Sequence, residues 1–173
     1  LAALRQADCV PPELIFDNAG DEQTPWLELL EKGALPERHP AGDPGHLMVQ
    51  PEWEALLNAS VSSGKADHWL AWWHLGNMRY ENHDNAGAIE AWKNSLKKRR
   101  TSWALRNLAV AEARSANQAA TPTSGRPDSF CTSPAALELL SEAWEAGPRN
   151  AWLTVEYAQA LLLSREYQRM HAF

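Results

Sequence analysis

Apolar residues recur at helical spacing along the chain from residue 24 onward, and polar or Pro/Gly-rich breaks separate these stretches. Residues 51–64 predict a helix with one buried side, because most of their apolar positions fall three or four residues apart. Residues 24–33 predict a shorter helix, which Thr24-Pro25 opens and Gly33 stops. The positions expected to face inward are Leu27, Leu29 and Leu30 in the shorter helix, and Trp53, Leu56, Leu57 and Val61 in the longer one.

The rest of the N-terminal part lacks this period. The first 23 residues contain Pro11-Pro12 and little helical period, which predicts irregular structure or a short helix. Residues 36–45 contain three prolines and two glycines, which predicts a loop.

A helix-turn-helix pattern follows at residues 67–98. The first helix, with Asp67 as its expected cap, carries Gly76 at a position where a small residue lets two helices approach closely. A turn at residues 82–85 precedes the second helix, where Trp92 is expected to fill the space beside Gly76. The anchor positions of the pair are Trp72, Leu75, Gly76, Ala88, Trp92 and Leu96.

The same register recurs twice. A second copy begins with a helix over about 102–116, and its partner helix opens at Ser133-Pro134 after a polar loop inserted at 117–133. A third copy begins near Trp152, and Tyr167 stands at the start of its second helix. The repeated anchors are Leu105, Leu108, Ala109, Ala136, Leu140, Ala143, Trp144, Tyr157 and Ala158.

These three registers resemble the tetratricopeptide repeat, a helix-turn-helix unit of ~34 residues. The resemblance implies an all-α fold in which antiparallel helix pairs stack into a right-handed superhelical solenoid. Residues 66–173 would then hold about 2.5 repeats, and residues 1–65 would form an irregular segment whose two helices pack on the array. Because the chain stops inside the last expected helix, we expect it to be a fragment of a larger protein.

A wider resemblance rests on the runs Leu47–Leu57, His68–Trp72 and Ser102–Ala109. They are similar to the C-terminal region of large microbial proteins in which a β-rich, carbohydrate-active-like domain of unknown function precedes tetratricopeptide repeats. The similarity covers about residues 26–160, apart from the inserted loop. It implies a repeat region that lies beside a carbohydrate-processing domain.

In tetratricopeptide proteins the first helix of each repeat lines a concave surface. The corresponding positions here are Leu70, Trp73, Asn77, Tyr80, Trp103, Arg106, Val110, Ala113, Trp152, Val155, Gln159 and Leu162. Aromatic rings with a few polar groups suit an extended peptide, a helix or a sugar ring. The other interpretation is that these aromatic residues pack against the N-terminal helices or a further domain.

The best-known ligand of this repeat family is the acidic C-terminal tail of a chaperone, which a two-carboxylate clamp holds. Asn77 and Asn107 match the two amide positions of that clamp. Its basic positions hold Trp73, Trp152 and Glu156, none of which neutralises a carboxylate. The resemblance therefore argues against chaperone tails as the partner.

Composition narrows the possible partners. The net charge of −6 and the isoelectric point near 5.5 give no reason to expect a nucleic-acid partner. The apolar runs are too short to span a bilayer and the start does not resemble a signal peptide, so we expect no membrane partner and a cytoplasmic location. Cys9 and Cys131 neither demand nor exclude a disulfide, although a reducing compartment is the simpler expectation.

Candidate chemistry is sparse. His68 and His74 are six residues apart, which does not place two metal ligands on one helical face. No Gly-rich phosphate loop follows a strand pattern, so we expect neither metal nor cofactor nor catalytic residue in this chain. The basic run 97–100 stands at a predicted helix C-terminus, where positive charge complements the exposed carbonyls. The alternative is that the run binds an anionic partner.

The sequence thus favours a non-catalytic interaction or scaffold module. Its partner would be a protein or peptide segment, or an upstream domain of the same protein. The candidate groove residues are Trp73, Asn77, Tyr80, Trp103, Arg106, Asn107, Trp152 and Gln159. The alternative is an accessory helical domain of a carbohydrate-processing enzyme, with groove tryptophans in contact with sugar or with the upstream domain.

Overall fold

The structure is a computed structural model that describes residue 20, residues 22–119 and residues 133–170. Cys9, Cys131 and most of the expected loop 117–133 lie outside these described residues. Within them, all regular secondary structure is helical. In chain order the helices are α1 (Thr24–Lys32), α2 (Pro51–Ser62), α3 (Trp69–Glu81), α4 (Asn85–Lys98), α5 (Ser102–Ala119), α6 (Pro134–Ala146), α7 (Ala151–Leu163) and α8 (Tyr167–Met170).

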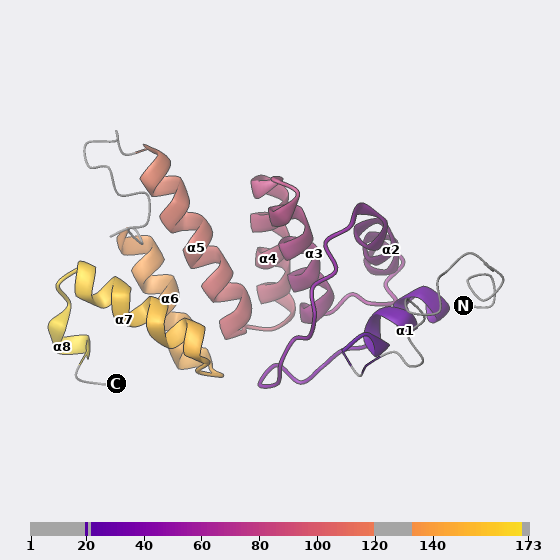
Figure 1. The fold of residues 1–173 in the computed structure, drawn as a ribbon, viewed down its shortest axis with the longest axis horizontal. Coiled ribbons are helices and arrows are strands. Elements are labelled where there is room, and N and C mark those ends of the chain that lie inside the picture. Colours follow the sequence, from indigo (N-terminus) through magenta and orange to yellow (C-terminus); the bar gives the residue numbers. More distant parts are fainter. Residues whose placement is uncertain (1–19, 21, 120–132, 171–173) are drawn as a thin grey trace, which may run out of the picture.

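The helices follow one another along the long axis of the molecule (Figure 1). Helices α3 and α4 form one closely packed pair and α5 and α6 form a second, while α4 against α5 and α6 against α7 join successive pairs. At the N-terminal end α2 packs on α3, and α1 packs on α2. The expected all-α class, with neighbouring helices packed in chain order, is confirmed.

Several predicted helix boundaries are confirmed by their capping bonds. Asp84 Oδ1 accepts a hydrogen bond from the Gly87 amide at 2.9 Å and caps α4. Ser133 caps α6 in the same way, with Pro134 in the first turn. Gly33 ends α1 in the left-handed region, at φ 68°, which a glycine adopts without a steric cost.

Other local predictions were wrong. His68, not Asp67, caps α3, because the Asp67 carboxylate instead accepts hydrogen bonds from Trp72 Nε1 at 2.8 Å and Lys98 Nζ at 2.6 Å. At α1 the N-cap is Gln23, and Thr24 is already helical. The buried face of α1 holds Trp26 beside Leu29, whereas Leu30 is 48 % exposed. Helix α5 also runs to Ala119, past the expected end at 116.

Helices α3 and α4 approach each other closely at Gly76 and Trp92. A Cβ atom added to Gly76 would overlap the five-membered ring of the Trp92 indole. The indole, buried in the core, therefore fills the space that the missing side chain leaves. This confirms the packing that the sequence predicted for the first repeat.

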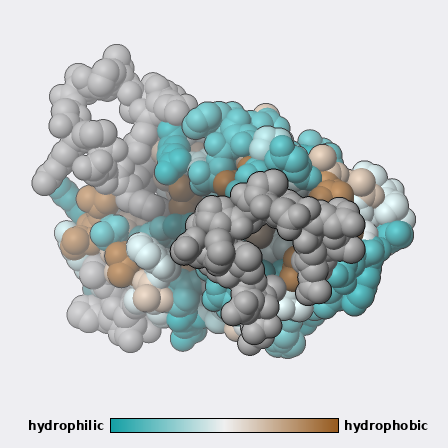
Figure 2. Space-filling view, turned by 45° about the vertical axis from the view of Figure 1, so that its right-hand side comes forward, coloured by the Kyte–Doolittle hydropathy of each residue, from teal (hydrophilic) through white to brown (hydrophobic). Residues whose placement is uncertain are grey.

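Two clusters of buried apolar residues hold the helices together. The first extends from α1 and α2 through α3 and α4 to α5, and the loop residue Leu35 belongs to it. The second joins α5, α6 and α7 around Leu140, Leu153 and Leu161. Because α5 contributes to both clusters, it connects the N-terminal and C-terminal parts of the molecule. Figure 2 shows a mostly hydrophilic described surface on one side, with hydrophobic residues exposed in separate places.

Candidate functional site

Helices α3, α5 and α7 share one face, and two hollows lie on it. The first, called here the Trp152 hollow, has a volume of about 330 Å³ and is lined by Trp73, Ser102, Trp103, Arg106, Asn107, Asn150, Trp152 and Leu153. The second, the Asn77 hollow, has a volume of about 240 Å³ and is lined by Leu47, Asn77, Tyr80, Glu81, Trp92, Arg106, Asn107, Val110 and Arg114. The two hollows meet at Arg106 and Asn107.

This face brings together most of the groove residues expected from the sequence. Trp73, Trp103, Arg106, Asn107 and Trp152 line the Trp152 hollow. Asn77 and Tyr80 line the Asn77 hollow. Gln159 is exposed on α7 and lines neither of the two.

The expected groove tryptophans differ sharply in exposure. Trp73 is only 7 % exposed and packs in the core, edge-on to His74 and to Trp103 with ring centroids 4.9 and 6.3 Å away. Trp152 is 75 % exposed. The expectation that the Trp73 ring is free to contact a partner is therefore not met, and Trp152 is the open aromatic surface of this face.

A loop from the N-terminal part, residues 35–46, crosses α3 and reaches the start of α5. Five ring nitrogens donate hydrogen bonds to its backbone carbonyls. The pairs are Trp26 Nε1 to His46 at 3.0 Å, His68 Nε2 to Leu35 at 2.9 Å, Trp69 Nε1 to Arg38 at 3.2 Å, His74 Nε2 to Pro44 at 3.2 Å and Trp103 Nε1 to Pro40 at 3.1 Å. These bonds satisfy carbonyls that no helix or sheet would satisfy.

These bonds give one expected groove residue a partner within the chain. Trp103 donates to the N-terminal loop, as the buried Trp69 and Trp26 do, whereas the packing interpretation named the N-terminal helices or a further domain. This contact with the loop was not predicted from the sequence. Two features of the sequence could have indicated it. A loop with three prolines has few backbone N–H groups for its own carbonyls, and the nine tryptophans of the chain are side-chain donors that can bond to such carbonyls.

His74 is fixed in its neutral form at the centre of this contact. Its Nε2 faces the Pro44 carbonyl, which can only accept, so the proton sits on Nε2. Its Nδ1 is buried without a hydrogen-bond partner. Burial lowers the pKa of His74 from 6.5 to about 3, and the nearby charge of Arg38 acts in the same direction, against the effect of the Pro44 bond.

A chain of polar contacts joins α7, α5 and α3 between the two hollows. The Arg106 guanidinium donates to both carboxylate oxygens of Glu156, with Nε at 2.7 Å from Oε2. It also donates to Asn107 Oδ1 at 3.2 Å, and Asn107 Nδ2 donates to Asn77 Oδ1 at 2.7 Å. Because a guanidinium can only donate, it fixes the orientation of both amides.

This chain of contacts determines what the face offers an acidic ligand. The positive charge of Arg106 is paired with Glu156, whose side chain is 13 % exposed. The two clamp amides, Asn77 and Asn107, bond to each other. The face thus presents neutralised rather than free positive charge at its centre.

Four buried polar atoms of residues that line the two hollows have no hydrogen-bond partner. They are Trp73 Nε1, Asn77 Nδ2, Trp92 Nε1 and Ser102 Oγ. Trp73 and Ser102 line the Trp152 hollow, and Asn77 and Trp92 line the neighbouring one. Each unsatisfied group of this kind costs about 1–3 kcal/mol unless a partner supplies the missing bond.

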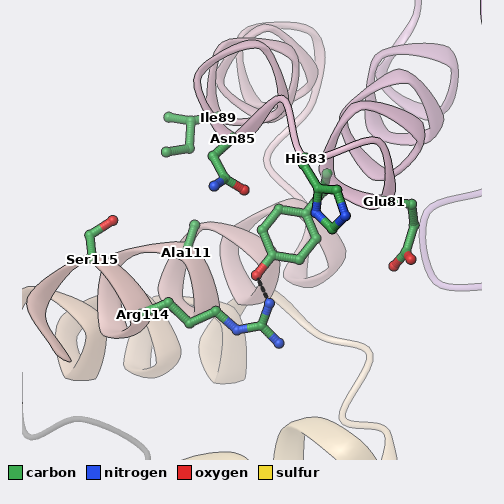
Figure 3. Close-up of a pocket in the computed structure, with 8 residues that line it drawn as sticks. Glu81, His83, Asn85, Ile89, Ala111, Arg114 and Ser115 are labelled. Atoms are coloured by element: carbon green, nitrogen blue, oxygen red, sulfur yellow. Dashed lines mark hydrogen bonds between the residues drawn. The ribbon is translucent and has the colours of Figure 1, made fainter. Parts of the chain in front are cut away.

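A further hollow, of about 420 Å³, lies where the turn before α4 approaches α5 (Figure 3). Arg114 lies with its guanidinium carbon 5.1 Å from the centre of the Tyr80 ring and donates a hydrogen bond to the Tyr80 hydroxyl. Figure 3 shows Glu81 and His83 on the opposite side from Arg114 and Ser115. Opposite charges therefore share this hollow, and no pattern in the sequence had predicted it.

The basic run at the end of α4 has partners in the structure. Lys98 pairs with Asp67, and this bond, with that of Trp72, lowers the pKa of the Asp67 carboxyl. Arg100 pairs with Glu142 of α6. Both ion pairs are partly exposed, so each contributes at most about 1 kcal/mol to the stability of the fold. They support the interpretation that the basic run stabilises the fold.

Within the described ranges, no group of three or more His, Cys, Asp or Glu residues could hold a metal ion. None of the helices described in the structure combines the length and apolar character needed to cross a membrane. Comparison of the chain with protein-family models, with curated proteins and with solved structures gave no match.

Proposed function

We propose that this chain is a non-catalytic interaction module of the tetratricopeptide type, which binds a protein segment on the face formed by α3, α5 and α7. One observation carries the proposal. The indole of Trp152 is 75 % exposed beside a hollow whose other walls come from α3 and α5. A large aromatic ring exposed next to a cavity supplies the kind of anchor site that protein segments use.

The repeat assignment is supported by packing at the diagnostic positions. Gly76 and Trp92 interlock between α3 and α4, and the anchor Leu105 of the next copy is buried. Tyr157, the anchor of the third copy, packs in the C-terminal core cluster. A right-handed solenoid that continues this arrangement is part of the proposal, as is a cytoplasmic location.

The non-catalytic role is supported by the polar contacts on the face. Arg106 and Glu156 pair with each other, and Asn107 and Asn77 join α5 to α3. Groups held in this way stabilise the arrangement of the helices, and their charges are compensated. The face therefore offers shape and aromatic surface, which suits recognition.

Peptide selection from a random display library, with the 173-residue chain immobilised, tests this function. We expect selected peptides to bind Trp152→Ala at least about ten-fold more weakly than the wild type, while the melting temperature stays the same. Leu163→Ala is the matched control, since Leu163 is an exposed apolar residue of α7 that does not line the hollow. Selected peptides that bind Trp152→Ala as well as the wild type would contradict the proposal.

The second candidate is an accessory domain of a carbohydrate-processing enzyme. The exposed ring of Trp152, with Asn150 and Arg106 beside it, is compatible with a sugar stacked on the indole. Oligosaccharides that change the fluorescence of the wild type but not of Trp152→Ala would favour this candidate. Trp152 covered by an upstream domain in a longer form of the protein would favour an internal contact instead.

A further inference from the structure

We propose that the exposed side of α7 binds a second copy of this chain, with the two α7 helices antiparallel about a two-fold axis at Gln159. This inference goes beyond the proposed function, which concerns the Trp152 hollow. It follows from the apolar character of both sides of α7, from the area that the exposed side offers and from the position of Gln159 within it.

Helix α7 is apolar on both of its sides. The inner side packs in the C-terminal core cluster through Leu153, Tyr157 and Leu161. The outer side is a row of exposed residues whose helical spacing places them on one face. This row, called here the α7 stripe, consists of Trp152, Val155, Gln159, Leu162 and Leu163. A surface helix normally turns charged and polar residues to water, whereas a helix that is apolar all round is normally covered.

Exposed apolar side chains are concentrated in this part of the molecule. Of the eight large hydrophobic residues that are exposed in the described part of the chain, five lie between residues 152 and 167. They are the four apolar members of the α7 stripe and Tyr167 of α8. Their exposed fractions correspond to on the order of 500 Å² of apolar surface per copy. Two copies together would bury about 1,000 Å², which is enough for a specific dimer of micromolar affinity.

The charge distribution allows two copies to meet at the α7 stripe. The net charge of −6 repels copies of this chain from one another, so a contact between them needs a part of the surface without net charge. None of the five stripe residues is charged. The carboxylate of Glu156, on the neighbouring side of α7, is paired with Arg106 of α5.

The position of Gln159 makes the α7 stripe self-complementary. Gln159 is its only polar member and lies at its centre, with two apolar residues on either side. In an antiparallel pair centred on Gln159, Val155 of one copy faces Leu163 of the other, because each lies four residues from the axis. The two Gln159 amides then meet, and each carries the donor and the acceptor that the other needs. A purely apolar partner would leave this amide without a hydrogen bond.

Sedimentation equilibrium of the 173-residue chain, from about 1 to about 500 μM, tests the proposal. We expect a monomer–dimer equilibrium. Leu162→Asp should raise the dissociation constant at least about ten-fold, because a two-fold dimer contains the substitution twice. The matched control is Leu30→Asp, since Leu30 of α1 is 48 % exposed against 53 % for Leu162 and the change in charge is the same. Leu30→Asp should leave the dissociation constant unchanged.

A cross-linking variant tests the position of the axis without placing a charge in the contact. The background is Cys9→Ser/Cys131→Ser, which removes both cysteines of the chain. In this background Gln159→Cys should form a disulfide-linked dimer in oxidised glutathione, because helices about 8–10 Å apart bring the two Cα atoms at a two-fold axis within disulfide reach. Leu30→Cys is the control and should stay monomeric.

Each of three results would overturn the proposal. They are a chain that is still monomeric at about 500 μM, a dimer that Leu162→Asp weakens no more than Leu30→Asp does, and cross-linking at Gln159 that does not exceed cross-linking at Leu30. None of them affects the proposed function, because Leu162, Gln159 and Leu30 do not line the Trp152 hollow. Conversely, a dimer that Leu162→Asp dissociates, in a chain that selects no library peptide, would overturn the proposed function alone.

Discussion

The side-chain amide of Asn107 donates a hydrogen bond to Oδ1 of Asn77 over 2.7 Å and so joins α5 to α3 between the two hollows. Both side chains are buried, at 7 and 8 % exposure. The orientation of the pair follows from Arg106, which donates to Asn107 Oδ1 and leaves Nδ2 to face Asn77. A polar contact of this kind fixes how two helices sit, because a shifted arrangement would leave both amides unsatisfied.

Asn107→Ala should destabilise the protein by about 1–3 kcal/mol, because it leaves Asn77 Oδ1 buried without its donor. The double variant Asn77→Ala/Asn107→Ala removes both partners, so its cost should be smaller than the sum of the single costs by about 1 kcal/mol. Urea unfolding of the four proteins measures the difference. Strictly additive costs would mean that the two amides do not stabilise each other.

Gly76→Ala should destabilise the protein although alanine is the better helix former. The added Cβ atom overlaps the buried Trp92 indole, and overpacking of this kind costs about 1–3 kcal/mol, against a gain of about 1 kcal/mol in helix propensity. In a Trp92→Phe background the smaller ring leaves room, so Gly76→Ala should there be neutral or stabilising. Thermal unfolding of the single and double variants checks this, and the same loss in both backgrounds would show that Trp92 is not the obstacle.

The Gly76–Trp92 contact could be predicted from the sequence because its cause is local. Both residues belong to consecutive helices joined by a short turn, and the repeat pattern that the sequence resembles pairs a small residue on the first helix with a large one on the second. The cap of α3 could not be predicted in the same way. Asp67 is a residue type that often caps helices. Its carboxylate instead accepts hydrogen bonds from Trp72 and from Lys98, which is 31 positions away, and His68 caps the helix.

The candidate site was predictable in outline and wrong in one important respect. The resemblance to the tetratricopeptide repeat predicted Trp73, Trp103 and Trp152 on one face, and they line one hollow. Register did not reveal that the loop 35–46 returns over this face, since a Pro/Gly-rich segment has no period that fixes its path. That return explains why Trp103 has a partner within the chain, while Trp152 remains exposed.

His74 should make the stability of the fold depend on pH in the acidic range. Its pKa is about 3 when folded, below the usual 6.5, so between these values the unfolded chain binds more protons than the folded chain. The contribution of His74 is therefore fully present above pH 6.5 and is lost as the pH falls toward 3, by at most about 1.4 kcal/mol per pH unit.

Comparison with His74→Leu isolates this effect. The variant loses the bond to Pro44 at every pH, which shifts its stability by a constant amount, but it has no group to titrate at this position. The unfolding free energy of the wild type minus that of the variant should thus fall as the pH is lowered from 7 to 4. A difference that stays constant over this range would show that His74 takes up its proton without unfolding.

Trp103→Phe should loosen the loop 35–46 without unfolding the helices, because it removes only the indole donor to the Pro40 carbonyl and part of a half-buried ring. A lost bond of about 1 kcal/mol would raise the population of the opened loop roughly five-fold. Limited trypsin digestion, with the cut after Arg38 followed by mass spectrometry, measures that population when opening is fast relative to cleavage.

The matched control is Trp92→Phe, since Trp92 Nε1 has no hydrogen-bond partner and the same ring change there breaks no bond to the loop. When the cleavage rates are compared under conditions in which the two variants have the same unfolding free energy, we expect faster cleavage after Arg38 in Trp103→Phe alone. Equal rates in the two variants would mean that helix packing, and not the bond to Pro40, holds the loop in place.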